Sequence, residues 1–519
     1  METIVFKGGT VIDGTGASPS SCDVLISDGT IERVGVFEAS ADARVIDCRG
    51  LAIAPGFIDS HSHLDLQVLE NRPEKVAQGV TAEVVGNCGF SPYPAAPDRK
   101  LMHDYANGLF CGDTDWGWPS AGAYLEQAAR STTTAVFSLV GHGSLRIARV
   151  GHQQGQLAER DLDWMEQKLS ESFEEGACGF STGLMYSPGA SAPFSELERL
   201  CRVVARHQKI YATHMRGYGD LLIEAVDEQL QLARRTGCRL QISHFQAVGL
   251  RNWSKQQVAL EKIEKAVAEG LDIGFDCYPY IAGSTVLTQL LPQWALEGGI
   301  NGLLARLAHV SERKRIATET EASLEQGWTN ILISSLETTP NRSLIGQTIA
   351  AIATRRGREP VEVVFDLIQQ EQGRVNMLEM NQSEANLCQA LSHPLSCVIS
   401  DGFYVKCRPH PRLYGTFPLL LGEMSREREW LTLAAAVHKI TEKPARRFSI
   451  PKRGRLEPGY FADLVVFDPR TVNSPASYEN PTLPPRGIRH VFSNGVVVLS
   501  EGVVNFPDQV KGPDSDGHF

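Results

Sequence analysis

Hydrophobic and polar positions alternate at both ends of the chain, and turn-forming pairs interrupt the alternation. The stretches predicted as strands cover residues 3–6, 10–12 and 24–26 near the start and 463–467 near the end, with expected turns at Gly8-Gly9, Asp28-Gly29 and Asn494-Gly495. Alternation with a period of two is typical of half-buried strands, and Asx-Gly pairs are typical of hairpins. We therefore expect the two ends, residues 1–54 and 450–506, to pair into one small β domain.

Between these ends, short apolar runs alternate with amphipathic stretches that predict helices. The runs predicted as strands are 52–58, 81–85, 135–140, 179–182, 210–213, 239–243, 273–277 and 397–400, and helices are expected at 162–175, 196–207, 221–235 and 253–269. This alternation indicates an α/β fold with parallel strands, and eight such strands close a barrel. We expect a (β/α)8 barrel, TIM-like, over residues 55–449.

Two segments do not fit this repeat. Residues 288–344 separate the seventh predicted strand from the next barrel helix and contain several helical runs, which predicts an inserted subdomain. Residues 507–519 are rich in Asp, Gly and Pro, which predicts a flexible tail.

Composition and charge exclude several classes of partner. The chain has 519 residues, with 50 Lys and Arg against 61 Asp and Glu, which gives a formal charge of −11. Because phosphate binding needs clustered positive charge, we expect no nucleic-acid partner. No stretch is apolar enough to span a membrane, so we expect a cytoplasmic protein without a membrane partner. The 11 cysteines show no paired spacing, which favours free thiols.

Side chains with metal-binding groups directly follow several predicted strands. These residues are His61, His63, Cys88, His214, His244 and Asp401. In a closed parallel barrel all strand C-termini open onto one face, so we expect these side chains to converge. Neutral imidazole and thiolate are ligands that Zn²⁺ prefers, and this set could hold one or two ions.

A zinc ion at this face would support hydrolysis. Bound Zn²⁺ lowers the pKa of a water molecule to about 7 and polarises a carbonyl oxygen. Hydrolysis of an amide follows, with Asp401 taking the proton from the attacking water and returning it to the departing nitrogen.

Each of these residues also has a structural interpretation. The His61–His63 pair could simply pack within a strand, and Cys88 could be a small buried hydrophobic residue. His214 or His244 could be a hydrogen-bonded core residue, and Asp401 could begin a turn. Their occurrence together at five strand ends favours the metal site. The other ten histidines are expected to be structural, and His142 after the third strand is the first to reconsider.

Several longer motifs resemble the D-aminoacylase family, the N-acyl-D-amino-acid deacylases of the amidohydrolase superfamily. These motifs are AIAPGFIDSHSHLD, GVTAEVVGNCGFSP, GACGFSTGLMYSPG, YATHMRGYGD, LQISHFQAVG, DCYPYIAGST, ISDGF and HPRLYGTFP. The resemblance runs essentially from end to end and includes the terminal strands. It implies a distorted (β/α)8 barrel with a small β-sandwich built from both termini. It also implies hydrolysis of an N-acyl-D-amino acid to a carboxylate and the free D-amino acid.

The resemblance also implies roles for the residues of the site. Zinc would be held tightly by Cys88, His214 and His244, whereas His61 and His63 belong to a second, weaker metal position. Asp401 corresponds to the general base.

The substrate carboxylate would contact Tyr278, Ser284 and Arg412, groups that suit an anion. The structural alternatives are an ordinary aromatic residue for Tyr278 and a surface ion pair for Arg412. Gln246 stands where the family usually has lysine. Because this removes a positive charge, the substrate is expected to present a different or masked group there, such as an amide, an ester or a peptidic portion.

Two other functions stay open. A barrel with the same metal site could open a cyclic amide, as hydantoinases and dihydroorotases do, because one fold serves many chemistries. A catalytically silent homologue used for assembly is the other alternative, although such proteins typically lose metal ligands.

Overall fold

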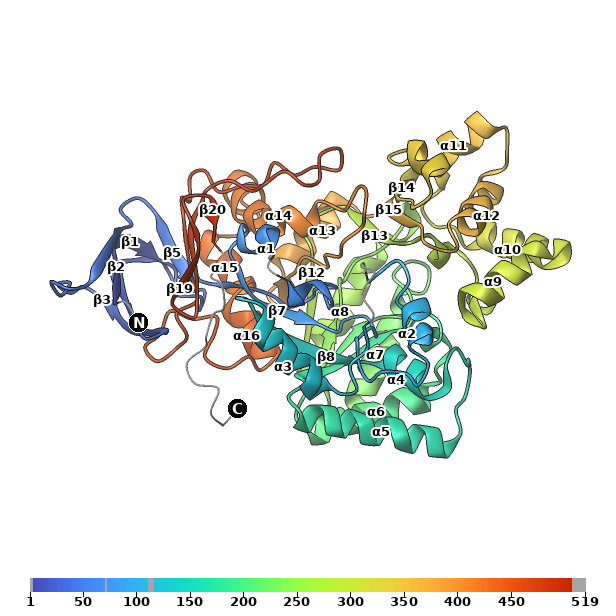
Figure 1. Cartoon of the computed structure of the whole chain (residues 1–519), viewed down its shortest axis with the longest axis horizontal. Helices are drawn as coiled ribbons and strands as arrows, with labels where there is room; N and C mark the ends of the chain where they lie inside the picture. The colour runs from blue at the N-terminus through green and yellow to red at the C-terminus, as the bar shows by residue number, and fades with distance from the viewer. Residues whose placement is uncertain (1–2, 71, 111–115, 506–519) are drawn as a thin grey trace.

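The computed structural model describes residues 3–70, 72–110 and 116–505. The predicted tail, residues 507–519, lies outside the described residues. Figure 1 shows the strands from the two ends of the chain side by side, the α/β barrel in the middle, and helices α9 (Gly299–Ala308) to α12 (Pro360–Gln370) on the opposite side.

The centre of the molecule is a parallel sheet of eight strands. Along the chain these are β6 (Phe57–Asp59), β7 (Val80–Val85), β8 (Ala135–Gly141), β9 (Gly179–Gly183), β10 (Ile210–His214), β11 (Arg239–Ile242), β12 (Ile273–Cys277) and β16 (Ser396–Val398). The two edges meet just beyond β6 and β16, where Ser62 bridges Gly402 and Asp401 N donates to His61 O at 2.9 Å. The predicted barrel is confirmed.

Amphipathic helices pack in succession around the outside of the barrel. The predicted helices correspond to α5 (Glu159–Glu174), α6 (Phe194–Arg206), α7 (Leu222–Thr236) and α8 (Lys255–Ala268), each within a few residues. Helix α7 ends at Gly237, whose φ of 70° provides the left-handed C-cap. No helix in the described residues combines the length and hydrophobicity needed to cross a membrane.

The predicted strand at 52–58 is wrong in one respect, because it is two strands that belong to different sheets. Strand β5 (Ala52–Pro55) pairs with β17 (Leu464–Phe467) in the terminal sheet, whereas β6 is the first barrel strand. Gly56 lies at the break, and a Cβ there would lie 2.1 Å from Thr81 Oγ1. Because both strands are fully buried, the apolar run continues across the break and hides it in the sequence.

The two ends of the chain form one nine-stranded sheet. It curls so that the ring of Phe6 lies 5.0 Å from that of Phe492, although their strands are not neighbours. The two Asx-Gly hairpins are present, with positive φ at both central residues. The predicted turn at Gly8-Gly9 is wrong, since both residues lie within β1 (Ile4–Val11) at a register shift. Gly8 has a φ of 72°, which permits a bulge in place of a turn.

The insertion after β12 has a sheet and a core of its own. Its strands are β13 (Ala282–Val286), β14 (Ile331–Ser335) and β15 (Asn376–Met380), and its helices are α9, α10 (Val310–Ser323), α11 (Ile349–Arg356) and α12. A cluster of buried hydrophobic residues extends from Leu287 to Met377. This unit starts before and ends after the predicted range 288–344, and the chain then re-enters the barrel through α13 (Glu384–Ser392). Division of the chain at residues 54 and 449 stays a prediction.

Candidate metal centre

The predicted ligands lie together on one rim of the barrel, at the C-terminal ends of its strands. His214 is the last residue of β10, and the others follow β6, β7, β11 and β16 by a few residues. Cys88, His244 and Asp401 adopt left-handed φ values of 53°, 33° and 48°. Non-glycine residues rarely adopt such values outside sites where the surrounding structure imposes them. The loops are therefore shaped around these side chains.

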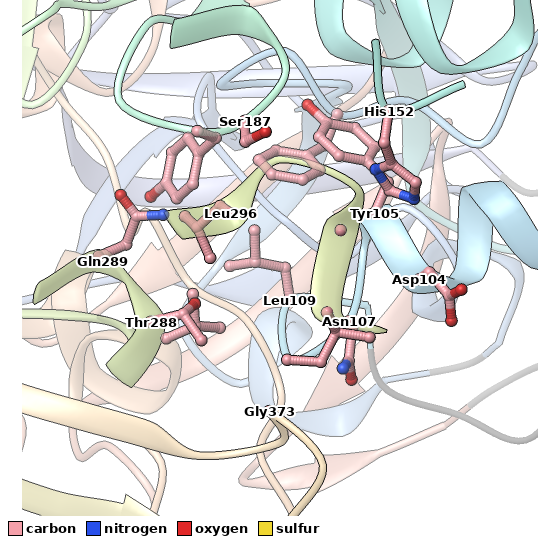
Figure 2. Close-up of a pocket in the computed structure, with 15 residues that line it drawn as sticks. Asp104, Tyr105, Asn107, Leu109, His152, Ser187, Thr288, Gln289, Leu296 and Gly373 are labelled. Atoms are coloured by element: carbon pink, nitrogen blue, oxygen red, sulfur yellow. The ribbon is translucent and has the colours of Figure 1, made fainter. Parts of the chain in front are cut away.

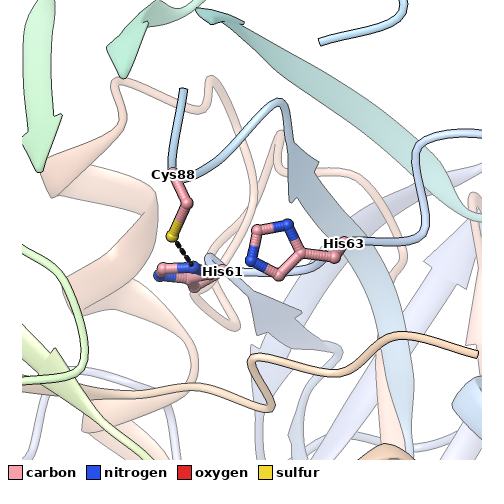
Figure 3. A group of neighbouring side chains, drawn as sticks. All are labelled: His61, His63 and Cys88. Atoms are coloured by element: carbon pink, nitrogen blue, oxygen red, sulfur yellow. Dashed lines mark hydrogen bonds between the residues drawn. The ribbon is translucent and has the colours of Figure 1, made fainter. Parts of the chain in front are cut away.

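Cys88 is the point at which two groups of donors meet. Its Sγ lies 3.4 Å from His61 Nε2 and 3.5 Å from His244 Nε2. Figure 3 marks the contact between Cys88 and His61 with a dashed line. The ring of His214 lies 4.6 Å from that of His244. The donor atoms of Cys88, His214 and His244 all lie within 4.8 Å of one another. His61, His63 and Cys88 form a second group that meets the same limit.

Asp401 faces the histidine pair with one oxygen and an arginine with the other. Its Oδ1 lies 3.3 Å from His61 Nε2 and 3.2 Å from His63 Nε2. Its Oδ2 lies 2.9 Å from Arg412 Nη1. Burial opposes ionisation of Asp401, but Arg412 and His61 outweigh it and hold the pKa of this carboxyl well below its usual range.

The environment fixes the charge of the other donors. Burial raises the pKa of Cys88, but the neighbouring rings of His61, His214 and His244 outweigh it, so the net pKa is well below the usual value. Burial lowers the pKa of His214 and keeps its imidazole neutral. Burial also disfavours the charged form of His63, yet Asp401 and Cys88 raise its pKa to about 9. The centre thus holds a thiolate beside a neutral imidazole, and a protonated imidazole opposite.

Several buried nitrogen atoms of this centre have no hydrogen-bond partner among the described residues. They are both ring nitrogens of His214 and the Nδ1 atoms of His63 and His244. Buried polar atoms without partners are uncommon and call for an explanation such as a bound ion. A thiolate with imidazole nitrogens is a donor set that suits Zn²⁺. The residues therefore fit a zinc ion.

Sequence reasoning missed Asp276, which orients two of the histidines. Its Oδ1 accepts a hydrogen bond from the backbone N of His244 at 2.6 Å and lies 3.5 Å from His61 Nδ1. Asp276 is 1% exposed within β12. The signal that could have found it is an acidic residue within an otherwise apolar predicted strand.

A buried ionic network lies beneath the centre and joins the first and last barrel strands. Asp59 accepts a hydrogen bond from the backbone N of Ser400 at 3.0 Å and pairs with Lys75 of α1 (Pro73–Val76). Lys75 Nζ also donates to Ser400 Oγ at 3.0 Å and lies 3.4 Å from Glu83 Oε2. Arg72 pairs with the other oxygen of Glu83. Because Asp59 and Ser400 precede His61 and Asp401, the network fixes both loops.

The four residues expected to contact substrate also converge. Tyr278 donates a hydrogen bond from its hydroxyl to Gln246 Oε1 at 3.1 Å. The guanidinium of Arg412 lies 4.7 Å from the centre of the Tyr278 ring, and Arg412 Nη2 donates to the backbone oxygen of Ser284. Arg412 therefore links this group to Asp401.

A cavity of about 80 Å³ lies between the barrel and the insertion (Figure 2). Aromatic rings of Phe90, Tyr105 and Tyr186 line it, together with Leu296 from the insertion. The Tyr186 ring lies 4.9 Å from the ring of His214, so the cavity adjoins the metal centre. It offers room for an apolar group of a small molecule.

His142 does not take part in the centre. Its Nε2 lies 2.8 Å from Glu196 Oε1, and Arg146 pairs with the same carboxylate. All three side chains are buried. The structural role predicted for His142 agrees with this position.

Relatives of the chain share nearly its whole length. A sequence model of the amidohydrolase family matches residues 44–499. The N-acyl-D-glutamate deacylase of Alcaligenes xylosoxydans xylosoxydans is 36% identical over 501 residues, which cover 96% of this chain and 94% of the relative.

Two solved structures have the same fold. One is the N-acyl-D-glutamate deacylase of Bordetella bronchiseptica in complex with zinc and a phosphonate inhibitor that mimics the tetrahedral intermediate. Its TM-score is 0.81 and its sequence identity is 33%, and the match covers 95% of this chain and 96% of the deacylase. The second is a D-aminoacylase with a binuclear metal centre, for which one-metal activation and second-metal attenuation are described. Its TM-score is 0.81 and its sequence identity is 33%, and the match covers 96% of this chain and 97% of the D-aminoacylase. The resemblance noted in the sequence is confirmed: the chain belongs to the D-aminoacylase group of the amidohydrolase family.

Proposed function

We propose that this protein is a zinc-dependent hydrolase that cleaves the amide bond of an N-acyl-D-amino acid or a related N-acyl compound. The observation that carries the proposal is the group formed by Cys88, His214 and His244 with the carboxylate of Asp401 on the same rim. The names of two relatives from Alcaligenes xylosoxydans xylosoxydans support it, because one is an N-acyl-D-glutamate deacylase and the other a D-aminoacylase.

Cys88, His214 and His244 would hold the tightly bound zinc. The low pKa of Cys88 and the neutral imidazole of His214 support this, because metal ligands must be deprotonated. His61 and His63 would form the weaker position. Cys88 and Asp401 raise the pKa of both rings, so a second ion would have to displace a proton from each ring before it binds. When bound, zinc lowers the pKa of a water molecule to about 7 and polarises the carbonyl oxygen of an amide.

Asp401 would act as the general base and then as the general acid. Arg412 holds Oδ2, which leaves Oδ1 directed towards the histidine pair. From there Asp401 would accept a proton from the attacking water and return it to the departing nitrogen. Tyr278, Ser284, Arg412 and Gln246 would position the amino-acid part of the substrate.

The partner of this site would be a small N-acyl compound, with no nucleic acid or membrane as partner. We place the protein in the cytoplasm. The cysteines that the structure describes are all free thiols, which supports a reducing compartment.

A panel of N-acyl amino acids of both chiralities, assayed with and without added Zn²⁺, tests this function. We expect zinc-dependent release of the free amino acid from the D-compounds and little from the L-compounds. Hydrolysis that is indifferent to zinc, or cleavage of hydantoins in preference to every N-acyl compound, would contradict the proposal.

A further inference from the structure

A continuous group of polar side chains runs from the centre towards the insertion, and we call it the polar wall. It consists of Arg412, Tyr278, Gln246, Gln382, Asn381 and Glu379. Arg412 covers the Tyr278 ring, and the Tyr278 hydroxyl contacts Gln246 at 3.1 Å and accepts from Gln382 Nε2 at 3.2 Å. Glu379 lies at the far end, on β15 of the insertion.

The positive end of the polar wall is already engaged. Arg412 pairs with Asp401 at 2.9 Å and donates to the backbone oxygen of Ser284. In the described parts of the chain, no other lysine or arginine forms an ion pair or hydrogen bond with a side chain of the wall. A second negative charge beside Tyr278 would therefore lack a free cation to balance it.

The negative end of the polar wall has spare hydrogen-bonding capacity. Glu379 accepts one hydrogen bond from Asn381 Nδ2 at 3.1 Å, and no described lysine or arginine pairs with it. Burial raises the pKa of Glu379 to about 7, and the nearby Glu325 adds to this effect. Asn381 is 3% exposed, and its Oδ1 has no hydrogen-bond partner among the described residues.

Gly283, the second residue of β13, lies close to both Asn381 and Tyr278. A Cβ at Gly283 would lie 3.5 Å from Asn381 Nδ2 and 3.6 Å from the Tyr278 hydroxyl. Polar groups from the barrel and from the insertion therefore lie next to one another beside the substrate residues, and Gln246, Gln382 and Glu379 are each only partly buried. The wall runs from a guanidinium at one end to a carboxylate at the other.

We propose that the polar wall binds a carboxamide group on the amino-acid part of the substrate, as a primary amide or as the next peptide bond, in place of a free carboxylate. The inference rests on the proposed function and specifies its substrate class. A carboxamide is neutral, and its oxygen can accept from the second N–H of Gln382 Nε2 while its own N–H donates to Asn381 Oδ1 and Glu379. A free carboxylate would place two like charges close together without a free cation, which disfavours binding.

The test compares N-acetyl-D-leucine with N-acetyl-D-leucine amide on the zinc-loaded full chain, and measures acetate release from both. Leucine can contact the aromatic rings and Leu296 that line the cavity adjoining the centre. We expect kcat/KM to be about tenfold higher for the amide, the effect of one well-placed hydrogen bond. The ratio of the two values is the informative quantity, because a merely structural defect lowers both together.

Two variants of the polar wall should move this ratio towards the free acid. Glu379→Gln removes the negative end, and Gln246→Lys adds a cation beside Tyr278, so we expect each to lower the preference for the amide about tenfold. Glu319→Gln is the matched control, because this partly exposed carboxylate of the insertion accepts from Arg315 Nε at 2.8 Å and lies outside the wall. It should keep the preference of the natural chain. If Glu379→Gln does not fold, Gln246→Lys alone decides.

The outcomes separate the two proposals. Zinc-dependent hydrolysis that favours the free acid, with a ratio unchanged in Gln246→Lys, would overturn the carboxamide site and leave the deacylase function standing. If neither compound nor any other N-acyl-D-amino acid is hydrolysed by the zinc-loaded protein, the proposed function itself fails.

Discussion

Cys88 is the residue on which the metal centre depends most. It contacts donors of both groups, and it is the thiolate in a set otherwise made of imidazoles and one carboxylate. Its negative charge also stabilises the protonated forms of His61 and His63. Loss of this sulfur would therefore change both metal positions.

Replacement of Cys88 by serine tests this dependence. Serine keeps the size of the side chain but not the thiolate, so we expect zinc affinity and kcat/KM to fall by roughly 100-fold or more, since even groups behind the ligands contribute 10- to 100-fold. Metal analysis and steady-state kinetics measure the two effects. Cys48→Ser is the control, because Cys48 is buried in the terminal sheet and should leave zinc content unchanged. Full zinc content in Cys88→Ser would refute the assigned ligand.

Glu379 should leave a signature in the pH dependence of stability. Its pKa rises from an ordinary 4.5 to about 7 in the folded chain, so the folded state binds this proton more tightly than the unfolded state. The free energy of unfolding therefore falls as pH rises through this window and stays lower above it. Relative to the natural chain, Glu379→Gln should gain roughly 1–3 kcal/mol between about pH 5 and pH 8. Urea denaturation at both pH values measures the gain, and a difference that does not change with pH would speak against the raised pKa.

At the residue scale, the sequence predicts the donors but not the groups that orient them. His61, His63, Cys88, His214, His244 and Asp401 were found because each follows a recognisable apolar strand. Asp276 lies inside a strand and forms its contacts with His244 and His61 only after the barrel closes. Glu379 reaches the site through the insertion, so nothing local in its sequence marks it.

Among the structural elements, the join between β6 and β16 is the place where the barrel closes and the site is formed. Backbone hydrogen bonds link Asp401 to His61 and His63 to Gly402, and the network around Lys75 lies directly below. Lys75 is fully buried and faces Asp59 and Glu83. Its charge therefore balances two carboxylates that water cannot reach.

Lys75→Met should be strongly destabilising. The substitution leaves Asp59 unpaired and Glu83 with Arg72 alone, and removal of one partner from a buried ion pair costs about 3–5 kcal/mol. Denaturant unfolding measures this loss. Lys168→Met removes a partly exposed pair with Glu171 and should cost less than about 1 kcal/mol. Equal losses in the two variants would show that the network contributes little.

The strands also show where sequence patterns stop being informative. The eight barrel strands were predicted because each is an apolar run of the expected length between turn signals. The division of residues 52–58 into β5 and β6 was missed because both strands are buried and the run continues across Gly56. The turn predicted at Gly8-Gly9 is wrong because a pair of glycines is compatible with a β-bulge as well as with a turn.

On the scale of the whole molecule, the site is assembled from parts of the chain that are far apart in sequence. The barrel supplies the donors, and the insertion supplies Ser284, Glu379 and one side of the cavity. The terminal sheet continues into the barrel where β5 is followed by β6. The extent of the insertion was underestimated from sequence, because α11 and α12 have the same amphipathic pattern as barrel helices. A bound metal would hold the loops of several strands together.

Removal of the metal should therefore lower the stability of the folded chain. A ligand that binds only the folded state stabilises it by about 2.7 kcal/mol at a concentration 100 times its Kd. We expect dialysis against a chelator to lower Tm by several degrees and added zinc to restore it. Scanning calorimetry measures the shift, and an unchanged Tm after complete zinc removal would be inconsistent with a metal that joins the loops.

X-ray absorption at the zinc edge, on protein loaded with one equivalent of zinc, tests the central claim most directly. A centre formed by Cys88, His214 and His244 predicts a single sulfur scatterer at about 2.3 Å and imidazole nitrogens at about 2.0–2.1 Å. A spectrum with nitrogen and oxygen scatterers but no sulfur would contradict it.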